Sequence, residues 1–288
     1  MIYTFITTRC DDLPTRTCCR TLKVSTSGFY AWRSRPLSAR ALADSLLTSK
    51  IVDIHAASRA SYGSPRISDE LRLVYNIRVS RKRVERLMRL AGLQGVYKRR
   101  KVFVRTGAAA QPTVDLVNRQ FRALRPNQLW LTDITEHQTA AGKLYLAAVL
   151  DVWSRRIVGW SMATHLRTEL VTDALQMAIW RRGLNGTIVH SDRGSQFTSW
   201  AFGHKLRSAG LLGSMGAVGS CYDNAMIESF FGTMQLELLD RKRWTTRQEL
   251  ATAVFEWIEA WYNPKRRHSS VGSLSPIEFE IAHAENAA

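Results

Sequence analysis

Three acidic residues in the second half of the chain have the type and the setting for metal-dependent chemistry. Asp133 lies on the same face of a predicted strand as Leu129 and Leu131, where an unpaired carboxylate is costly to desolvate unless it meets a cation. Asp192 follows an apolar strand at a strand-to-loop exit, a place where α/β folds hold ligands. Glu228 lies early in a predicted helix. Converging carboxylates would form an oxygen-rich site suited to Mg²⁺ and to phosphoryl transfer.

Composition alone does not select these three acids. Asp151 and Asp223 are competitors, and a turn former, a helix cap or a salt-bridge partner explains most Asp and Glu residues. The spacing favours the three, because 58 residues separate Asp133 from Asp192 and 35 separate Asp192 from Glu228. This spacing resembles the D, D-35-E catalytic core of DDE transposases and retroviral integrases.

The elements that must position the carboxylates are predicted from residue 126 onward, where apolar residues alternate or form short runs between turn residues. Strands come first, and strand and helix then alternate, which indicates an α/β fold with a mixed sheet flanked by helices. The predicted order is a strand at 128–135, a hairpin of strands at 143–152 and 156–163, a helix at 168–182, a strand at 187–190, a helix at 199–209, a strand at 211–215 and a helix from about 224.

The first part of the chain differs from the second in charge. Residues 1–125 hold 25 Lys and Arg against 8 Asp and Glu, whereas residues 126–288 hold 16 of each, so the whole net charge of +17 belongs to the first part. Such an asymmetry indicates a polyanion-binding module, and nucleic acid is the obvious polyanion. The alternatives are a solvated basic surface or a contact with an anionic membrane.

A helix-turn-helix is predicted within the basic part, at about 51–95. A short helix at 65–74 and a polar turn precede a second helix from Arg81 to Ala91, which has Ser80 as its N-cap and Gly92 at its end. We expect the cations of this second helix to meet DNA phosphates and bases, although solvated charges on an ordinary amphipathic helix are the alternative. They are Arg81, Lys82, Arg83, Arg86 and Arg89.

Residues 98–125 are typical of a linker, and four more cations lie at their start. They are Lys98, Arg99, Arg100 and Lys101. We expect this linker to be basic enough to run along the DNA. Further upstream, Ser25 is a predicted cap of another helix. We therefore predict a basic helical DNA-binding region at 1–97, the linker, a catalytic core at 126–282 and a tail at 283–288.

Motifs along nearly the whole chain carry a closer resemblance. The chain resembles the second-frame transposase of bacterial insertion sequences that use two overlapping reading frames. In the second half the motifs are Leu131–Thr135, Leu150–Arg155, His190–Phe197, Cys221–Phe231 and Tyr262–Ser269 with Ser275 and Pro276, and in the first half they are Ser61–Ile67 and Val79–Val84.

The resemblance implies a ribonuclease H-like mixed five-stranded sheet flanked by helices, preceded by a small all-α helix-turn-helix region. It implies that Asp133, Asp192 and Glu228 bind two Mg²⁺ or Mn²⁺ ions. The implied reaction is cleavage of DNA at the ends of the element, followed by strand transfer by the freed 3′-hydroxyl. The implied partners are the terminal inverted repeats, target DNA, further copies of this chain on DNA, and the upstream-frame protein, to which a frameshift typically fuses this one.

Further residues receive roles from the same resemblance. His190, Gln196 and Asn224 are expected to support the site. Gln235 stands where many relatives have Lys or Arg facing the DNA end, so that DNA contact is expected to be weakened or moved. Two basic clusters are expected to clamp DNA backbones, namely residues 241–243 and the run Lys265, Arg266 and Arg267.

Other classes of protein are less favoured. The longest apolar run has seven residues, and the N-terminus has no signal-peptide pattern. Three of the four cysteines lie in the first twenty residues and the fourth stands alone, which is no disulfide framework. We therefore expect a cytoplasmic, nucleoid-associated protein with free thiols and no membrane contact. A DNA-binding repressor that lost its chemistry is the main alternative. A ribonuclease is possible from the fold, whereas a retroviral-type integrase would need zinc-binding His and Cys pairs that the sequence lacks.

Overall fold

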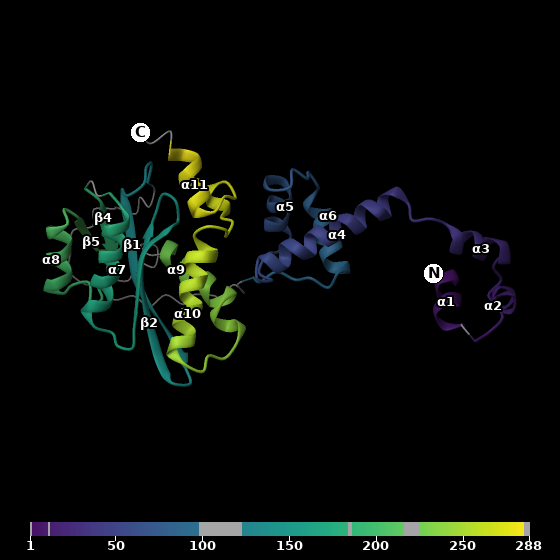
Figure 1. Ribbon diagram of the computed structural model, residues 1–288, viewed down its shortest axis with the longest axis horizontal. Coiled ribbons are helices and arrows are strands. Elements are labelled where there is room, and N and C mark those ends of the chain that lie inside the picture. Colours follow the sequence, from purple (N-terminus) through teal and green to yellow (C-terminus); the bar gives the residue numbers. More distant parts are fainter. Residues whose placement is uncertain (1, 11, 98–122, 184–185, 216–224, 285–288) are drawn as a thin grey trace, which may run out of the picture.

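The computed structural model describes residues 2–10, 12–97, 123–183, 186–215 and 225–284. These residues form a small N-terminal helical unit, a three-helix unit and a larger α/β domain (Figure 1). The predicted linker falls mostly on residues 98–122, so Lys98, Arg99, Arg100 and Lys101 lie outside the described residues, as do Asp223 and Asn224.

The N-terminal unit has a core of its own. Ile6, Cys18, Cys19 and Phe29 are buried together, and Ser25 accepts a hydrogen bond from Gly28 N at 3.2 Å, which confirms the predicted cap. The three cysteines of this unit are free thiols. Its helices are α1 (Ile2–Arg9), α2 (Thr15–Thr21) and α3 (Thr26–Ser34).

The three-helix unit contains the predicted helix-turn-helix. Ser80 caps the last helix by accepting a hydrogen bond from Arg83 N at 3.3 Å, and Gly92 follows that helix with φ +68°, a conformation that favours glycine. Both capping predictions are confirmed. The helices are α4 (Ala39–Ala57), α5 (Ser64–Leu73) and α6 (Arg81–Leu90).

The α/β domain is built on a mixed five-stranded sheet, as predicted, and its strand order is β3-β2-β1-β4-β5. β2 is antiparallel to β1 and β3, whereas β1, β4 and β5 run parallel. The first strand is longer than its sequence pattern indicates because its backbone pairs with β2 as far as the turn, where Thr139 faces Gly142. The strands are β1 (Leu129–Thr139), β2 (Gly142–Asp151), β3 (Ile157–Ala163), β4 (Ile188–Ser191) and β5 (Leu212–Met215).

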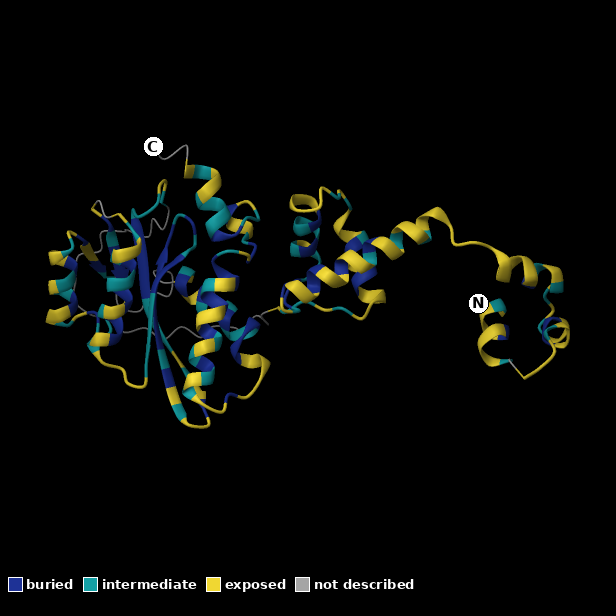
Figure 2. Ribbon diagram, in the orientation of Figure 1, coloured by how far each residue is buried: buried dark blue, intermediate teal, exposed yellow. Residues whose placement is uncertain are grey.

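Helices cover both faces of the sheet, whose strands are largely buried (Figure 2). Alternate strand residues divide between two cores: Trp130 packs with α7 and α8, whereas Leu131 packs with α9 and α10. α7 lies so close to β3 that a Cβ atom on Gly159 would come within 2.2 Å of the Ala174 carbonyl oxygen. The four helices are α7 (Thr168–Arg181), α8 (Trp200–Ser208), α9 (Ala225–Glu237) and α10 (Arg247–Glu256).

The C-terminal segment returns to the sheet. A π-helical stretch, η2 (Trp257–Tyr262), follows α10 and turns its aromatic residues into the core. The Asn263 side chain bonds both backbone groups of Ile157 at the start of β3, as a neighbouring strand would. It accepts from Ile157 N at 2.9 Å and donates to Ile157 O at 3.0 Å. The segment ends in η3 (Ser269–Val271) and α11 (Pro276–His283), and a short helix, η1 (Leu239–Arg241), precedes α10.

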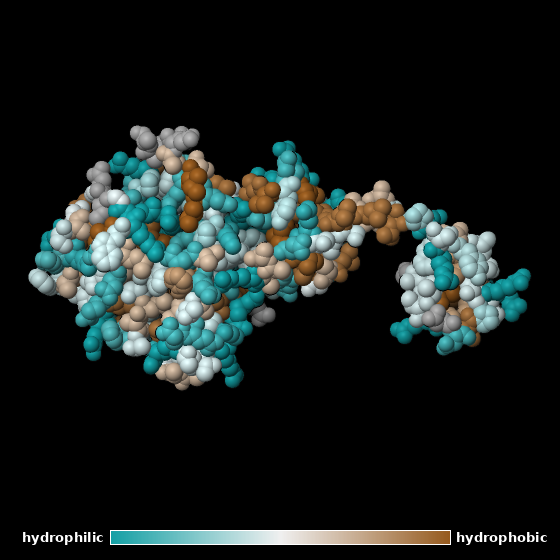
Figure 3. Space-filling view, viewed as in Figure 1, coloured by the Kyte–Doolittle hydropathy of each residue, from teal (hydrophilic) through white to brown (hydrophobic). Residues whose placement is uncertain are grey.

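The surface of the described part is mixed in polarity. None of its helices has the length and apolar character needed to cross a membrane. Figure 3 shows apolar side chains gathered along α4, where Leu42 and Leu46 are exposed.

Candidate active site

The sheet brings Asp133 and Asp192 together. β1 and β4 are neighbouring parallel strands in which Thr132 pairs with Ser191. Asp133 is the residue after Thr132 within β1, and Asp192 is the first residue after the end of β4. Both side chains line a cavity of about 220 Å³, together with Gln196 from the loop after β4. Two residues with 58 others between them in the chain therefore meet at the end of β4, where α/β folds hold ligands.

Neither aspartate is neutralised by a cation. Asp133 Oδ1 accepts a hydrogen bond from Ile134 N at 2.8 Å, and Asp192 Oδ1 accepts one from Gly194 N at 2.9 Å. Among the described residues, neither carboxylate forms an ion pair. Burial, with the nearby carboxylates of Asp192 and Glu228, raises the pKa of Asp133 to about 7. A bound cation would remove this conflict between burial and charge, so the donor set fits a divalent metal.

The Glu228 carboxylate lies close enough to raise the pKa of Asp133, but it does not line the same cavity. It is an exposed residue in the first turn of α9. Within the described ranges, no three His, Cys, Asp or Glu side chains are placed to hold one metal ion. The structure thus joins two of the three predicted carboxylates and places the third on the adjacent helix.

Asp151, a competitor for the site, has a structural role. Its side chain is fully buried and accepts hydrogen bonds from Asn127 N at 3.0 Å and from Trp153 N at 2.9 Å. These bonds stabilise the turn between β2 and β3. Burial raises the pKa of the Asp151 carboxyl, and the residue lies outside the cavity that Asp133 and Asp192 share.

The predicted supporting residues lie around the second strand end. His190 is buried, and its Nδ1 lies 3.0 Å from Ser214 Oγ on the neighbouring strand β5. Gln196 donates from Nε2 to Leu166 O at 3.2 Å, which ties the loop of Asp192 to the segment before α7. His190 therefore joins two strands, whereas Gln196 faces the cavity of the carboxylates.

Helix α6 presents its cations in two groups. Arg81, Lys82 and Arg89 are exposed. Asp44 of α4 holds the other two, since its Oδ1 accepts from Arg83 Nε at 2.8 Å and its Oδ2 accepts from Arg86 Nη2 at 2.6 Å. These two guanidinium bonds lower the pKa of Asp44. No local sequence pattern indicates this role of Asp44, because its partners lie about forty positions away.

The prediction that Arg266 and Arg267 clamp DNA is wrong. Their exposed fractions are 4% and 5%, and Glu237 accepts from Arg266 Nε at 3.0 Å and from Arg266 Nη2 at 2.8 Å. Arg267 pairs with Glu70 at 2.6 Å and with Glu278. Buried guanidinium groups that carboxylates already satisfy are not available to a DNA backbone. Lys265 is exposed, so its contact with DNA stays a prediction.

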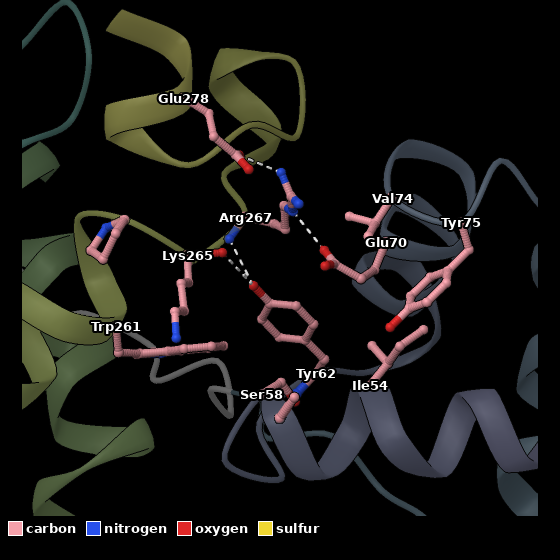
Figure 4. A pocket seen from close by; sticks show the side chains of 12 residues that line it. Ile54, Ser58, Tyr62, Glu70, Val74, Tyr75, Trp261, Lys265, Arg267 and Glu278 are labelled. Carbon is pink, nitrogen blue, oxygen red and sulfur yellow. Dashed lines mark hydrogen bonds and ion pairs between the residues drawn. The ribbon is translucent and has the colours of Figure 1, made fainter. Parts of the chain in front are cut away.

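Arg267 joins the α/β domain to the three-helix unit through Glu70 of α5. Arg266 holds Glu237 of α9, whose Oε1 also lies 3.8 Å from Arg66 Nη1 of α5. Figure 4 shows Arg267 between Glu278 of α11 and Glu70 of α5, above Tyr62. The Tyr62 hydroxyl accepts from Arg267 N at 2.8 Å, and the Tyr62 ring lies 5.6 Å from that of Trp261. Burial raises the pKa of Tyr62 to about 12. The junction therefore has satisfied charges, and its residues line a cavity of about 310 Å³.

Three of the remaining residues predicted to contact DNA have partners within the described part of the chain. Gln235 donates from Nε2 to Asp240. Arg241 donates to Arg59 O at 2.8 Å, and Lys242 pairs with Glu249 at 2.6 Å. Gln235 and the cluster at 241–243 are partly or fully exposed, so their contacts with DNA stay predictions.

Comparison with known proteins extends these observations. Residues 41–101 match a family model described as an HTH-like domain, and residues 123–221 and 210–276 match two models described as integrase core domains. The chain is 40% identical over 285 residues to the transposase InsF for insertion sequence IS3A of Escherichia coli strain K12, covering 97% of this chain and 98% of that protein. It is 39% identical to the transposase for insertion sequence element IS629 of Shigella sonnei, covering 92% and 90%. Among solved structures, the HTLV-2 integrase catalytic core domain in complex with magnesium is 19% identical, with a TM-score of 0.42, and the match covers 55% of this chain and 99% of that one.

Proposed function

This chain belongs to the transposase family of IS3-type insertion sequences, and we propose that it cuts DNA at the ends of its element with Asp133, Asp192 and Glu228 as catalytic carboxylates. The family and its integrase core make the chain a transposase of the polynucleotidyl transferase class, with DNA as its partner. The proposed second step is attack by the freed 3′-hydroxyl on another phosphodiester.

The observation that carries the assignment is the pairing of Asp133 with Asp192. They lie side by side at the end of β4, line one cavity and have no cationic partner in the described part of the chain. Structural aspartates normally have such partners or accept several hydrogen bonds, as Asp151 does. Two unpaired carboxylates at one strand edge instead favour a site that receives cations.

We propose that Asp133 and Asp192, joined by Glu228 of α9, hold two Mg²⁺ or Mn²⁺ ions. When bound, these ions would supply positive charge at the reacting phosphodiester. The chain's own contribution is positioning. The amides of Ile134 and Gly194 orient one oxygen of each aspartate, and the bond from Gln196 to Leu166 O fixes the loop of Asp192. Glu228 must approach the pair through movement of its side chain or of α9.

DNA would be held mainly by the basic helical part. The exposed cations of α6, Arg81, Lys82 and Arg89, are proposed to contact DNA directly. Asp44 fixes the directions of Arg83 and Arg86 on the same helix. We further propose that copies of this chain assemble on the terminal inverted repeats, together with or fused to the upstream-frame protein.

The test is a cleavage assay on duplex DNA carrying the terminal inverted repeat, with Mg²⁺ and either the full chain or its fusion with the upstream frame. Asp192→Asn should abolish nicking while metal-free DNA binding persists. Asp173→Asn, on the exposed side of α7, removes one equal charge away from the cavity and should leave nicking unchanged. Undiminished nicking by Asp192→Asn would refute the assigned site. Metal-independent binding with no nicking by any form of the intact protein would instead favour the repressor.

A further inference from the structure

A second polar cavity, separate from that of the carboxylates, lies at the junction of the domains. Its volume is about 280 Å³, and it lies where α5, the turn between β2 and β3, α9 and the segment after η2 meet. A cavity of this size exceeds the roughly 30 Å³ that one water molecule occupies in the liquid. Its polar lining includes Arg66, Arg155, Arg266, His268, Ser229 and Thr233.

The three arginines of this cavity are unequally neutralised. Glu237 pairs closely with Arg266, and its Oε1 lies 3.8 Å from Arg66 Nη1. Arg155 is half-buried, yet its guanidinium forms no hydrogen bond or ion pair with any residue in the described ranges. Burial lowers the pKa of Arg155. One carboxylate therefore faces three cations, and a desolvated cation without a partner indicates that an anion completes the site.

Neutral donors line the same cavity. Nε2 of His268 is buried and has no hydrogen-bond partner within the described part of the chain. Burial, with the nearby arginines, lowers the pKa of His268 well below its usual value, so its ring is neutral and can donate one N–H. The hydroxyls of Ser229 and Thr233 add donors from α9. Guanidinium, imidazole and hydroxyl donors around one space are the chemistry that binds phosphate.

The cavity lies next to the proposed active site along the chain. Met226, Ser229, Phe230 and Thr233 recur on one face of α9 and line the cavity, while Glu228 immediately precedes Ser229. Arg66 reaches the cavity from α5 of the three-helix unit. An anion held here would touch the DNA-binding unit and the helix of the third carboxylate at once.

We propose that this cavity binds a phosphate group of the DNA backbone, with Arg155 as its main ligand and Arg66 and His268 as further donors. The inference rests on the proposed function only in taking DNA as the source of the phosphate. The bound strand would then be fixed against α9 before any bond is cut.

The test is fluorescence anisotropy of inverted-repeat DNA in EDTA, which separates binding from the carboxylate chemistry. Arg155→Gln should weaken binding roughly tenfold, the scale of one lost charge-assisted bond. It should also reduce the slope of log K against log salt concentration by about 0.9, as expected for one lost phosphate contact. Arg207→Gln removes an equal charge from exposed α8 and should preserve the slope. An unchanged affinity and slope for folded Arg155→Gln would overturn the proposal.

Two further measurements cover the other outcomes. If Arg155→Gln does not fold, Ser270→Glu at the exposed rim of the cavity should weaken DNA binding by a similar factor, and unchanged binding would overturn the proposal. Inorganic phosphate should raise the melting temperature of the wild type more than that of Arg155→Gln. If phosphate does so while DNA affinity is unaffected, the assignment to DNA is overturned. Nicking by Asp192→Asn would refute the catalytic site and leave this inference intact.

Discussion

The domain junction and the carboxylate cavity use charged residues in opposite ways. At the junction, Glu237 and Glu70 are matched by Arg266 and Arg267, so buried charges of both signs are satisfied. At the cavity, one backbone amide is all that the described residues provide to offset the burial of the Asp133 carboxylate. A buried charged residue therefore cannot be assigned a structural or a functional role from its type alone. The role depends on whether the folded chain supplies an opposite charge beside it.

The largest effect on activity is expected when one charge in the carboxylate cavity is neutralised. Asp133→Asn should lower strand cleavage at least about 10³-fold, equivalent to roughly 4 kcal/mol of activation free energy. It should leave the melting temperature unchanged or higher, because it removes a buried charge that lacks a partner. Cleavage rates with Mg²⁺ and a thermal melt on the same preparation measure both. A variant that is inactive because it is unfolded would contradict the account.

Neutralising one charge at the junction should have the opposite effect. Glu237→Gln leaves Arg266 buried without its carboxylate and should lower the free energy of unfolding by about 3–5 kcal/mol. Chemical denaturation followed by circular dichroism measures this change. Glu136→Gln, which breaks the exposed pair with Lys143, is the matched control and should cost less than about 1 kcal/mol. Equal losses in the two variants would remove the distinction between the junction and an ordinary surface pair.

A smaller, pH-dependent effect is expected where α11 meets the sheet. Burial alone would raise the pKa of Glu280, but Arg182, Ser154 and Arg156 hold it below its ordinary value of 4.5. A carboxyl whose pKa is lowered on folding stabilises the protein above its unfolded pKa, and that contribution is lost as pH falls through the folded pKa. Wild type should therefore exceed Glu280→Gln in stability by about 1.5–3 kcal/mol near pH 7. Unfolding curves from about pH 7 to pH 3 should show this gap shrinking, and a constant gap would contradict the assignment.

The sequence predicts the elements well where their signals are local. Ser25 and Ser80 each cap the helix that follows, as their positions before the helices predict. The mixed sheet expected from the alternation of strands and helices is confirmed, whereas the order of its strands was not predicted. The extra length of β1 could not be predicted, because it depends on pairing with β2 rather than on the pattern of β1 itself.

The candidate site is less predictable because charge partners are distant in sequence. Arg267 looks like a DNA ligand in a basic run, but Glu70, 197 positions away, holds it at the junction. Arg155 lies in one of the motifs that carry the family resemblance, yet its neighbours in sequence do not indicate that its guanidinium is without a partner among the described residues. For the three carboxylates the spacing predicts the set, and the fold confirms only that Asp133 and Asp192 are adjacent.

Asp133 and Asp192, which have no cationic partner among the described residues, are proposed to form one site for divalent ions with Glu228. Anomalous diffraction from crystals of the protein with Mn²⁺ and inverted-repeat DNA tests this proposal. We expect manganese peaks within about 2.0–2.4 Å of Asp133 and Asp192 oxygens, with Glu228 drawn in as a further ligand. Ordered DNA with no manganese at these aspartates, or with Glu228 remaining apart from the metal, would contradict it.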